Sequence, residues 1–519
     1  MGKKEAFIDK MKSGYTFKGE SIKIGAAMLD GEVIPEAEIR LPLSTLNRHG
    51  LVAGATGGGK TKSFQMIAEA LSDASIPSLL MDIKGDLSGL GAAATTNPKI
   101  EDRYKKLNMT FLPASFPVEL LTLSEQKGVR LRATVTEFGP ILMTKILGLN
   151  DTQGGVVSMI FKYCDDNHFP LLDLKDFIKV LQYVGNEGKK ELQATYGNIS
   201  TTSTGTILRK VIELQQQGAD AFFGERSFDV EDLLRTSDDG RGIINILRVT
   251  DIQDRPKLFS TFMLQMLAEL YAVFPEEGDL EKPKLIIFID EAHLIFQEAS
   301  KALLDQINTV IKLIRSKGVG IYFCTQNPMD VPASILGQLG LKIQHSLRAF
   351  TANDRTVIKQ TAQNYPLTEF YKTEDLITNL GIGEALVTLL NEKGIPTPLA
   401  HVMMCTPRSR MDILSDSEIN TIVSNSKIAS HYNEVIDSQS AYELLNAKIA
   451  SAVQQTQTAK ETGPEAKKAG KPEPSTFEKI ADNSVVKSLL RTTGNTLIRS
   501  LLGSIGISTT TRKKQKTWF

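Results

Sequence analysis

The 519-residue sequence has few cysteines and no excess charge of either sign, and each absence excludes a class of protein. The three cysteines, Cys164, Cys324 and Cys405, lie far apart, so they form neither a zinc-ligand pair nor a closed disulfide framework. This usage is typical of a reducing compartment. Lysine plus arginine and aspartate plus glutamate both number 60, which excludes a protein that binds nucleic acid through bulk positive charge.

Long apolar runs are also missing. No stretch approaches the roughly 18 apolar residues that would cross a bilayer. Residues 1–6 carry positive charge, but the apolar stretch of a secretory signal does not follow them. We therefore expect a cytoplasmic protein. The hydrophobic content of 41% is that of an ordinary globular protein, and the length allows two to four domains.

Changes of pattern along the chain predict an α/β protein with one main core. Alternating residues on either side of Asp30-Gly31 predict a short N-terminal β segment over residues 1–45. A strand, a glycine-rich loop, a helix and a second strand follow within about thirty residues, which is the order of a βαβ unit in a parallel sheet. This core extends over residues 46–410, and we interpret its helix-rich stretch at about 125–240 as an insertion.

Beyond the core, the sequence predicts a helical extension over residues 411–452. Residues 453–475 are polar, rich in lysine and interrupted by proline, and we expect a disordered linker because they bury too little apolar surface to offset chain entropy. Residues 476–519 have apolar positions at helical spacing and end in a basic run. We interpret this amphipathic tail as a helix that docks on its own or a neighbouring subunit's body; the alternative is that it lies on a membrane surface or contacts DNA phosphates.

Residues 54–61 match the phosphate-binding loop G-x-x-x-x-G-K-[ST] at every fixed position. Glycines let backbone N–H groups converge on phosphate oxygens, and the helix that starts near Lys60 adds its positive N-terminal end. We expect Lys60 to reach the β- and γ-phosphates of ATP and the Thr61 hydroxyl to hold Mg²⁺. The predicted nucleotide-binding residues are Gly54, Ala55, Thr56, Gly57, Gly58, Gly59, Lys60 and Thr61.

The apolar run at residues 284–289 predicts a buried parallel strand that ends in Asp290 and Glu291. Such a strand delivers its last residues to the sheet edge where the phosphate loop lies. We expect Asp290 to bind Mg²⁺, through a water molecule, and Glu291 to polarise the water that attacks the γ-phosphate. The alternative is an ordinary strand capped by solvated acids.

Two further polar residues, Gln326 and Asp82, are predicted at that edge. Gln326 ends another strand-like run, where an amide can sense the γ-phosphate or orient water, although it also suits a turn before Pro328. Asp82 ends the strand after the phosphate-loop helix and can help to position metal or water. We interpret Lys84-Gly85-Asp86 behind it as a turn and His293 as a structural residue.

Together these segments resemble the HerA/FtsK class of P-loop motor ATPases, and most closely bacterial HerA-like proteins with a helicase HerA-like C-terminal domain. The resemblance covers roughly residues 15–410. It implies a RecA-like core, assembly as a homo-hexameric ring, and ATP-driven translocation on double-stranded DNA. The segments that carry it are the phosphate loop, Asp82–Asp86, Ile289–His293, Arg315–Gly320 and Thr325–Pro328.

The resemblance also implies an arginine that acts on the γ-phosphate bound by the neighbouring subunit. Arg315 occupies that position, where a fixed guanidinium would neutralise transition-state charge. Alternatively, Arg315 is a cation at a helix C-terminus, and Arg248 and Arg348 are lesser candidates. Family members carry a sizeable N-terminal β-barrel, whereas only about 45 residues precede the core here.

The residues leave the cargo open. An ATP-binding switch or scaffold that does not move DNA, and a motor for protein cargo, are the alternatives to a DNA translocase. The sequence identifies no partner nuclease or other partner protein.

Overall fold

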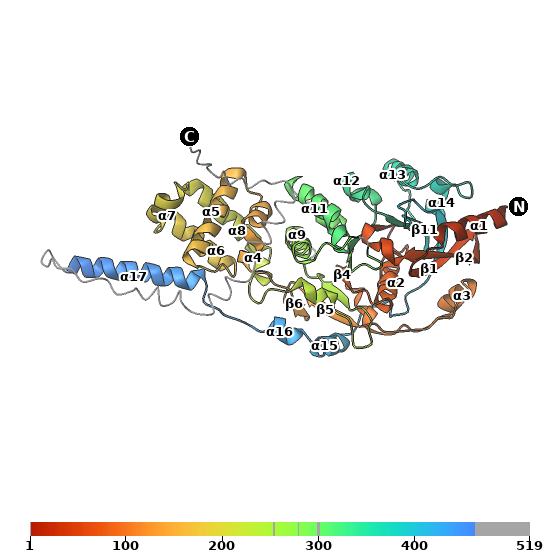
Figure 1. Ribbon diagram of the computed structural model, residues 1–519, viewed down its shortest axis with the longest axis horizontal. Coiled ribbons are helices and arrows are strands. Elements are labelled where there is room, and N and C mark those ends of the chain that lie inside the picture. Colours follow the sequence, from red (N-terminus) through yellow and green to blue (C-terminus); the bar gives the residue numbers. More distant parts are fainter. Residues whose placement is uncertain (1, 253–254, 279, 298–300, 462–519) are drawn as a thin grey trace, which may run out of the picture. The chain divides into compact units, whose positions relative to one another are not determined.

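In the computed structural model, the described residues are 2–252, 255–278, 280–297 and 301–461. They fall into two compact units (Figure 1). Of the described residues, the first unit comprises those within 2–131, Phe228–Ser260 and Phe274–Asn433. The second comprises those within Arg132–Ser227, Thr261–Val273 and 434–461.

Within the described residues, the first unit is built on a twelve-stranded sheet with the order β2-β1-β12-β11-β10-β3-β9-β8-β4-β7-β5-β6. From β10 to β6 every neighbouring pair is parallel, and from β2 to β10 every pair is antiparallel. The strands are β1 (Ser21–Leu29), β2 (Glu32–Pro42), β3 (Gly50–Ala53), β4 (Ser78–Asp82), β5 (Val118–Thr122), β6 (Val129–Arg130), β7 (Ile244–Arg248), β8 (Leu285–Ile289), β9 (Val319–Thr325), β10 (Leu341–Gln344), β11 (Glu384–Leu389) and β12 (Ala400–Met404).

The strand order identifies the architecture of the core. β9 lies between β3, which leads into the glycine-rich loop, and β8, which ends in the two acids. All three strands are buried along their whole length, as their apolar sequences require of central parallel strands. This is a RecA-like P-loop NTPase core, and the predicted α/β fold class is confirmed.

The strands predicted in the N-terminal segment are present and extend the core sheet. Asp30 and Gly31 form the turn between β1 and β2, and both have positive φ (52° and 85°), as a tight hairpin turn requires. The helix α1 that precedes them was not predicted. It buries Phe7, Met11 and Tyr15, spaced four residues apart, on one face. The single O–H of Tyr15 lies within hydrogen-bond distance of two carbonyl oxygens, those of Pro398 (2.7 Å) and of Val387 on β11 (3.0 Å).

Helices surround this sheet. Helices α15 and α16 pack beside β5 and β6 (Figure 1). The helical elements of the first unit, with η for 3₁₀ helices, are α1 (Lys3–Tyr15), η1 (Leu43–Arg48), α2 (Lys60–Asp73), η2 (Ser88–Gly91), α3 (Pro98–Lys106), η4 (Val230–Leu234), α10 (His293–Gln297), α11 (Lys301–Ile314), η5 (Arg315–Lys317), η6 (Pro328–Asp330), α12 (Ala333–Leu336), α13 (Ala352–Gln363), α14 (Thr373–Asn379), α15 (Asp416–Ser424) and α16 (Ala429–Asn433).

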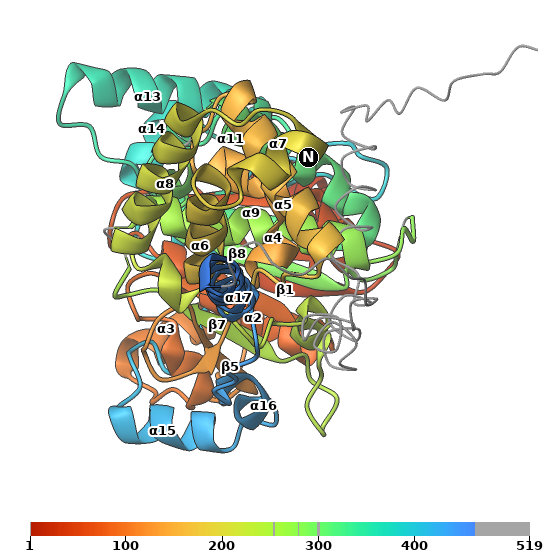
Figure 2. The same cartoon turned by 90° about the vertical axis from the view of Figure 1, so that its left-hand side faces the viewer.

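The second unit is helical in its described residues, and its main segment lies within the insertion predicted at about 125–240. Helix α9 (Pro256–Val273) begins in the first unit and ends in the second. Figure 2 shows α17 end-on, next to α6, against which it packs. The remaining helices are α4 (Val135–Ile146), α5 (Asp151–Asn167), α6 (Leu174–Gly185), α7 (Lys189–Tyr196), α8 (Thr201–Gln216), η3 (Ala219–Ala221) and α17 (Ala441–Glu461).

One predicted boundary is wrong. Helix α17 runs to Glu461, so residues 453–461 are helical although they were assigned to a disordered linker. The polar composition of residues 453–461 suggested disorder. However, a helix that is already nucleated and packed at its N-terminal end propagates at little cost through Gln, Thr, Ala and Lys. The rest of that linker and the tail at 476–519 lie outside the described residues. No helix in the described part of the chain is long and apolar enough to span a bilayer.

The close packing of β9 generates a test of the fold. A Cβ at Gly320 would lie 2.4 Å from the carbonyl oxygen of Leu46 and 2.6 Å from Cδ1 of Ile286. We predict that Gly320→Ala lowers the free energy of unfolding by about 1–3 kcal/mol, because backbone cannot yield as a flexible side chain does. The exposed control Gly19→Ala, where a Cβ would meet no atom within 4 Å, should change it by less than ~0.5 kcal/mol. Urea denaturation measures both, and equal values would contradict the packing.

Candidate active site

The glycine-rich loop between β3 and α2 is tied to the strands on both sides of it. The Ala55 N–H donates to the carbonyl of Ser346 (2.7 Å), just beyond β10, and the Gly54 N–H donates to the carbonyl of Thr325 on β9 (3.2 Å). Gly54 has φ 149°, and a Cβ there would lie 2.6 Å from Cβ of His345. The loop therefore needs glycine at this position for both conformation and space.

Lys60 is the first residue of α2 and is buried. Its ammonium donates to the carbonyl oxygens of Gly54 (2.7 Å) and Ala55 (3.3 Å). Both acceptors are neutral, so they orient the ammonium and leave its charge available to an anion. Thr61 follows on the first turn of the same helix, whose N-terminal end favours negative charge.

Asp290 and Glu291 directly follow β8 and are only 2% and 4% exposed. Oδ1 of Asp290 accepts a hydrogen bond from the Glu291 N–H (2.9 Å). Oδ2 of Asp290 and Oε2 of Glu291 are buried and have no hydrogen-bond partner. Burial raises the pKa of Asp290 above its ordinary value, and the neighbouring Glu291 carboxylate adds to the increase. Unmatched buried acceptors of this kind call for a cation or an ordered water molecule.

The sheet brings the loop and the acids to one edge. β9 separates β3 from β8, and adjacent strands lie about 4.8 Å apart, so the two carboxyl ends are about 10 Å apart. The pKa of Cys324, on β9, is affected by charged groups from both the acid pair and the loop. Burial raises the pKa of its thiol well above the ordinary value, the Asp290 carboxylate adds to this increase, and the Lys60 ammonium opposes it. The predicted apposition of loop and acids is thus present.

Lys84, which we interpreted as a turn residue, has its partner inside the site. Its ammonium donates a hydrogen bond to Oε1 of Glu291, and Oε2 of the same carboxylate lies 3.5 Å from Nδ1 of His293. Glu291 has φ 44°, an uncommon conformation for a residue other than glycine. The contact joins residues 207 positions apart, so no local pattern in the sequence points to it.

Asp82 and Gln326 lie at the same edge in different surroundings. Asp82 ends β4 and is fully buried, and its carboxylate accepts hydrogen bonds from the N–H groups of Gly85 (2.7 Å) and Leu87 (3.2 Å). Burial raises its pKa to about 7, and the nearby Asp86 carboxylate contributes. Asp82 therefore shapes the turn after β4, whereas Gln326 is the exposed residue after β9.

Of the three candidate arginines, Arg315 lies farthest from its own phosphate loop along the strand direction. It begins η5, before the amino end of β9, and its side chain is exposed. The carboxyl end of β9 pairs with the end of β3 that leads into the loop. Arg248 ends β7 and donates to the carbonyl of Lys127 (2.8 Å), and Arg348 is exposed beyond β10. The structure does not bring Arg315 to its own loop.

A second loop, immediately before β11, contacts the glycine-rich loop. The Gly383 N–H donates to the carbonyl of Gly58 (3.1 Å). The His345 ring lies between the two segments, with Nε2 2.9 Å from Oγ of Ser63 and Nδ1 2.8 Å from the carbonyl oxygen of Glu384. These contacts, which the sequence did not suggest, link the start of α2 to the antiparallel half of the sheet.

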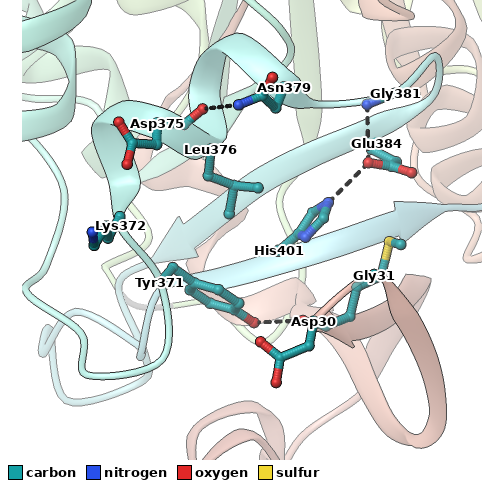
Figure 3. Close-up of a pocket in the computed structure, with 11 residues that line it drawn as sticks. Asp30, Gly31, Tyr371, Lys372, Asp375, Leu376, Asn379, Gly381, Glu384 and His401 are labelled. Atoms are coloured by element: carbon teal, nitrogen blue, oxygen red, sulfur yellow. Dashed lines mark hydrogen bonds and ion pairs between the residues drawn. The ribbon is translucent and has the colours of Figure 1, made fainter.

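Glu384 also anchors this loop from the other side. Its Oε2 accepts the Gly381 N–H (2.9 Å) and lies 2.9 Å from Nε2 of His401, a contact that holds the pKa of Glu384 below its ordinary value (Figure 3). Together with Asp30 and residues of α14, these side chains line a cavity of about 520 Å³. The loop beside the phosphate site is therefore fixed by hydrogen bonds at both ends.

A fold of this type, with a complete phosphate loop facing an acidic strand end, defines a P-loop ATPase of the HerA/FtsK class. The chain belongs to the family described as helicase HerA-like C-terminal, whose model matches residues 28–512.

Individual relatives are similar at low identity. The chain is 24% identical over 400 residues to the DNA double-strand break repair helicase HerA of Saccharolobus solfataricus, covering 74% of this chain and 69% of that one. It is 22% identical over 360 residues to the protein of the same description from Sulfolobus acidocaldarius, covering 67% and 64%. The chain thus spans about two thirds of the length of these relatives. A solved bacterial conjugative coupling protein, TrwBdeltaN70, is 13% identical with a TM-score of 0.49, over 78% of this chain and 94% of that one.

The residues present fit Mg²⁺ delivered with a nucleotide. In the described part of the chain, no group of three or more His, Cys, Asp or Glu side chains could hold a metal ion on its own. Mg²⁺ is usually held by one or two carboxylates together with substrate phosphates. Thr61 and Asp290, with its unmatched Oδ2, would hold it here. When bound, it would neutralise charge on the phosphate oxygens.

Two buried histidines predict a pH dependence of stability. Burial lowers the pKa of both His49 and His345 to about 4, from 6.5 for an ordinary histidine. The unfolded chain therefore takes up protons that the folded protein excludes. As a result, this contribution to the free energy of unfolding is complete above the unfolded pKa and is lost as the pH falls from about 6.5 towards 4.

Replacing His345 by Asn removes one of these contributions. We predict that the loss of unfolding free energy between pH 7 and pH 5 is about 2 kcal/mol smaller in His345→Asn than in the wild type. Urea unfolding at the two pH values measures it. The same pH dependence in His345→Asn as in the wild type would contradict the low pKa of His345.

Proposed function

We propose that this chain is the ATP-hydrolysing subunit of a hexameric ring that translocates double-stranded DNA. One observation carries the proposal: in a chain of the helicase HerA-like C-terminal family, the phosphate loop and a buried acid pair meet at one sheet edge. The description of the relatives as DNA double-strand break repair helicases supports DNA as the cargo.

The proposed chemistry divides among the residues of that edge. The N–H groups of residues 54–61 would bind the phosphates, and Lys60 would contact the β- and γ-phosphates. Glu291 would accept the proton of the attacking water, because its buried carboxylate has one unmatched oxygen. Gln326 would orient that water or sense the γ-phosphate. Asp82 would act by shaping the turn that follows β4.

Arg315 would act on the site of the neighbouring subunit. Its exposed position, before the amino end of β9, keeps it away from its own phosphate loop, as action across an interface requires. A guanidinium at a developing γ-phosphate charge would raise the hydrolysis rate by neutralising that charge.

The neutral net charge is compatible with DNA as cargo. A ring encloses the duplex, so a few pore-facing cations from each subunit sum to a strong contact with the phosphates. Binding of this kind would weaken steeply as the salt concentration rises.

Steady-state ATP hydrolysis with and without long duplex DNA tests the proposal. We expect DNA to stimulate hydrolysis, and Glu291→Gln to lower the stimulated rate by about 10²–10⁴-fold because the general base is lost. Glu281→Gln, which neutralises an exposed acid ahead of β8, should keep the wild-type rate. An ATP hydrolysis rate that is the same with and without DNA would contradict the proposed DNA translocase and favour a nucleotide switch or a motor for protein cargo.

Mixed rings test the assignment of Arg315. Arg315→Ala and Lys60→Ala subunits should each be inactive alone, and mixing them should restore part of the activity. The reason is that an intact loop in one subunit then meets an intact arginine in the next. A mixture of Glu291→Gln and Lys60→Ala is the matched control. This mixture should stay inactive, because each substitution disables the ATP site of the subunit that carries it and a neighbouring subunit cannot compensate. No recovery at any ratio in rings of wild-type size would exclude Arg315.

A further inference from the structure

The ion pair between Lys84 and Glu291 joins the ends of two neighbouring strands. β4 and β8 are parallel neighbours, with Met81 opposite Ile289. Lys84 lies three positions beyond Met81, and Glu291 lies two positions beyond Ile289. The Lys84 ammonium donates directly to Oε1 of Glu291. The residue proposed as general base is therefore held by a cation from the adjacent strand end.

The backbone that carries Lys84 is fixed, whereas its side chain is not enclosed. The fully buried carboxylate of Asp82, two residues before Lys84, accepts hydrogen bonds from the N–H groups of Gly85 and Leu87, which follow Lys84. These bonds fix the backbone of the turn that contains Lys84. The Lys84 side chain is 44% exposed, in contrast to 6% for that of Glu291. A long aliphatic chain on a fixed turn can move its ammonium without any change of fold.

The pairing opposes the proposed role of Glu291. An ammonium on Oε1 neutralises the carboxylate and occupies one of the two oxygens that can accept a proton from water. The other oxygen, Oε2, is buried and lacks a hydrogen bond. Lys84 is also the more exposed partner, so an arriving anion would reach it first.

We propose that Lys84 is a clasp on Glu291 that a nucleoside triphosphate opens. The clasp rests on the proposed ATPase function. Before nucleotide binds, Lys84 neutralises Glu291. The γ-phosphate then takes over the Lys84 ammonium, which contributes to triphosphate binding and releases the carboxylate for the attacking water. ADP lacks the γ-phosphate and leaves the pair closed. Lys84 is thus a positioning residue that couples recognition of the triphosphate to activation of the base.

A double-mutant cycle on the full-length protein tests the clasp. The measured quantity is the affinity for a non-hydrolysable ATP analogue and for ADP, by titration calorimetry. Because Glu291 competes with the γ-phosphate for Lys84, we expect Glu291→Gln to tighten analogue binding about 10-fold. Lys84→Met should weaken analogue binding about 10-fold while ADP affinity stays the same, and Lys84→Arg should retain most of the preference for the analogue.

The cycle isolates the competition. In the Lys84→Met background, the tightening caused by Glu291→Gln should largely disappear, since no ammonium remains to be freed. An equal tightening in both backgrounds would mean simple repulsion between Glu291 and the γ-phosphate, and would overturn the clasp. A parallel loss of ADP and analogue affinity in Lys84→Met would assign Lys84 a merely structural role and would also overturn it.

Two controls separate this inference from the function on which it rests. Lys127→Met removes another exposed lysine and should leave both affinities unchanged. Full ATP hydrolysis in Lys60→Ala or Glu291→Gln would refute the proposed ATPase site itself. If these two variants are inactive while the cycle shows no Lys84-dependent coupling, the site stands and only the clasp fails. The melting temperature of each variant shows whether it is folded.

Discussion

The parallel hydrogen bonding of β3, β9 and β8 is the constraint on which the site depends. Each of these strands is buried on both faces, so a slip of register would break the ladder and misplace every apolar side chain at once. Val52 is fixed opposite Cys324, and Ile289 opposite Phe323. The glycine-rich loop and the acid pair consequently lie at one edge of the sheet with a single strand, β9, between them. This placement follows from the strand pairing and does not depend on the conformation of the surrounding loops.

The two lysines at this edge have partners of different charge. Lys60 is held by neutral carbonyl oxygens, and Glu291 is held by Lys84. The Lys84 ammonium offsets the cost of burying the Glu291 carboxylate, whereas Oδ2 of the buried Asp290 has no hydrogen-bond partner. In the proposed mechanism, an incoming phosphate would exchange these partners without any change in the strands. The preorganised part of the site is thus its backbone, and the adjustable part is a pair of long lysine side chains.

Contacts from outside the βαβ unit hold the phosphate loop in shape. The Ser346 carbonyl accepts a backbone hydrogen bond from the loop and the Gly383 N–H donates one to it, and the His345 ring spans from Ser63 to Glu384, the first residue of β11. The antiparallel strands therefore support the loop in addition to extending the sheet. At the other end of the loop before β11, Glu384 holds Gly381 and contacts His401. These three residues line the cavity, and Gly383 of the same loop contacts Gly58.

The sequence by itself determined the fold class and the placement of the glycine-rich loop and the acid pair at one sheet edge, because these follow from local rules. A glycine pattern that ends in Lys60, and an apolar run that ends in Asp290 and Glu291, each describe a strand and what comes after it, and strand ends in a parallel sheet share an edge. The hairpin at Asp30 was predictable for the same reason. The end of helix α17 was not, since the packing of its first turns on α6 extends the helix beyond the predicted residues 411–452, through residues whose composition indicates a linker.

Only the tertiary structure decided which partner each charged group has. Lys84 reads locally as part of a turn, and nothing near it in the chain reveals that the adjacent strand end is that of β8, which places its ammonium on Glu291. Likewise, Asp82 was predicted to help position metal or water, and only the structure shows that its buried carboxylate accepts the N–H groups of that turn. Contacts between residues about two hundred positions apart depend on strand order, and strand order is a property of the whole sheet that no local pattern encodes.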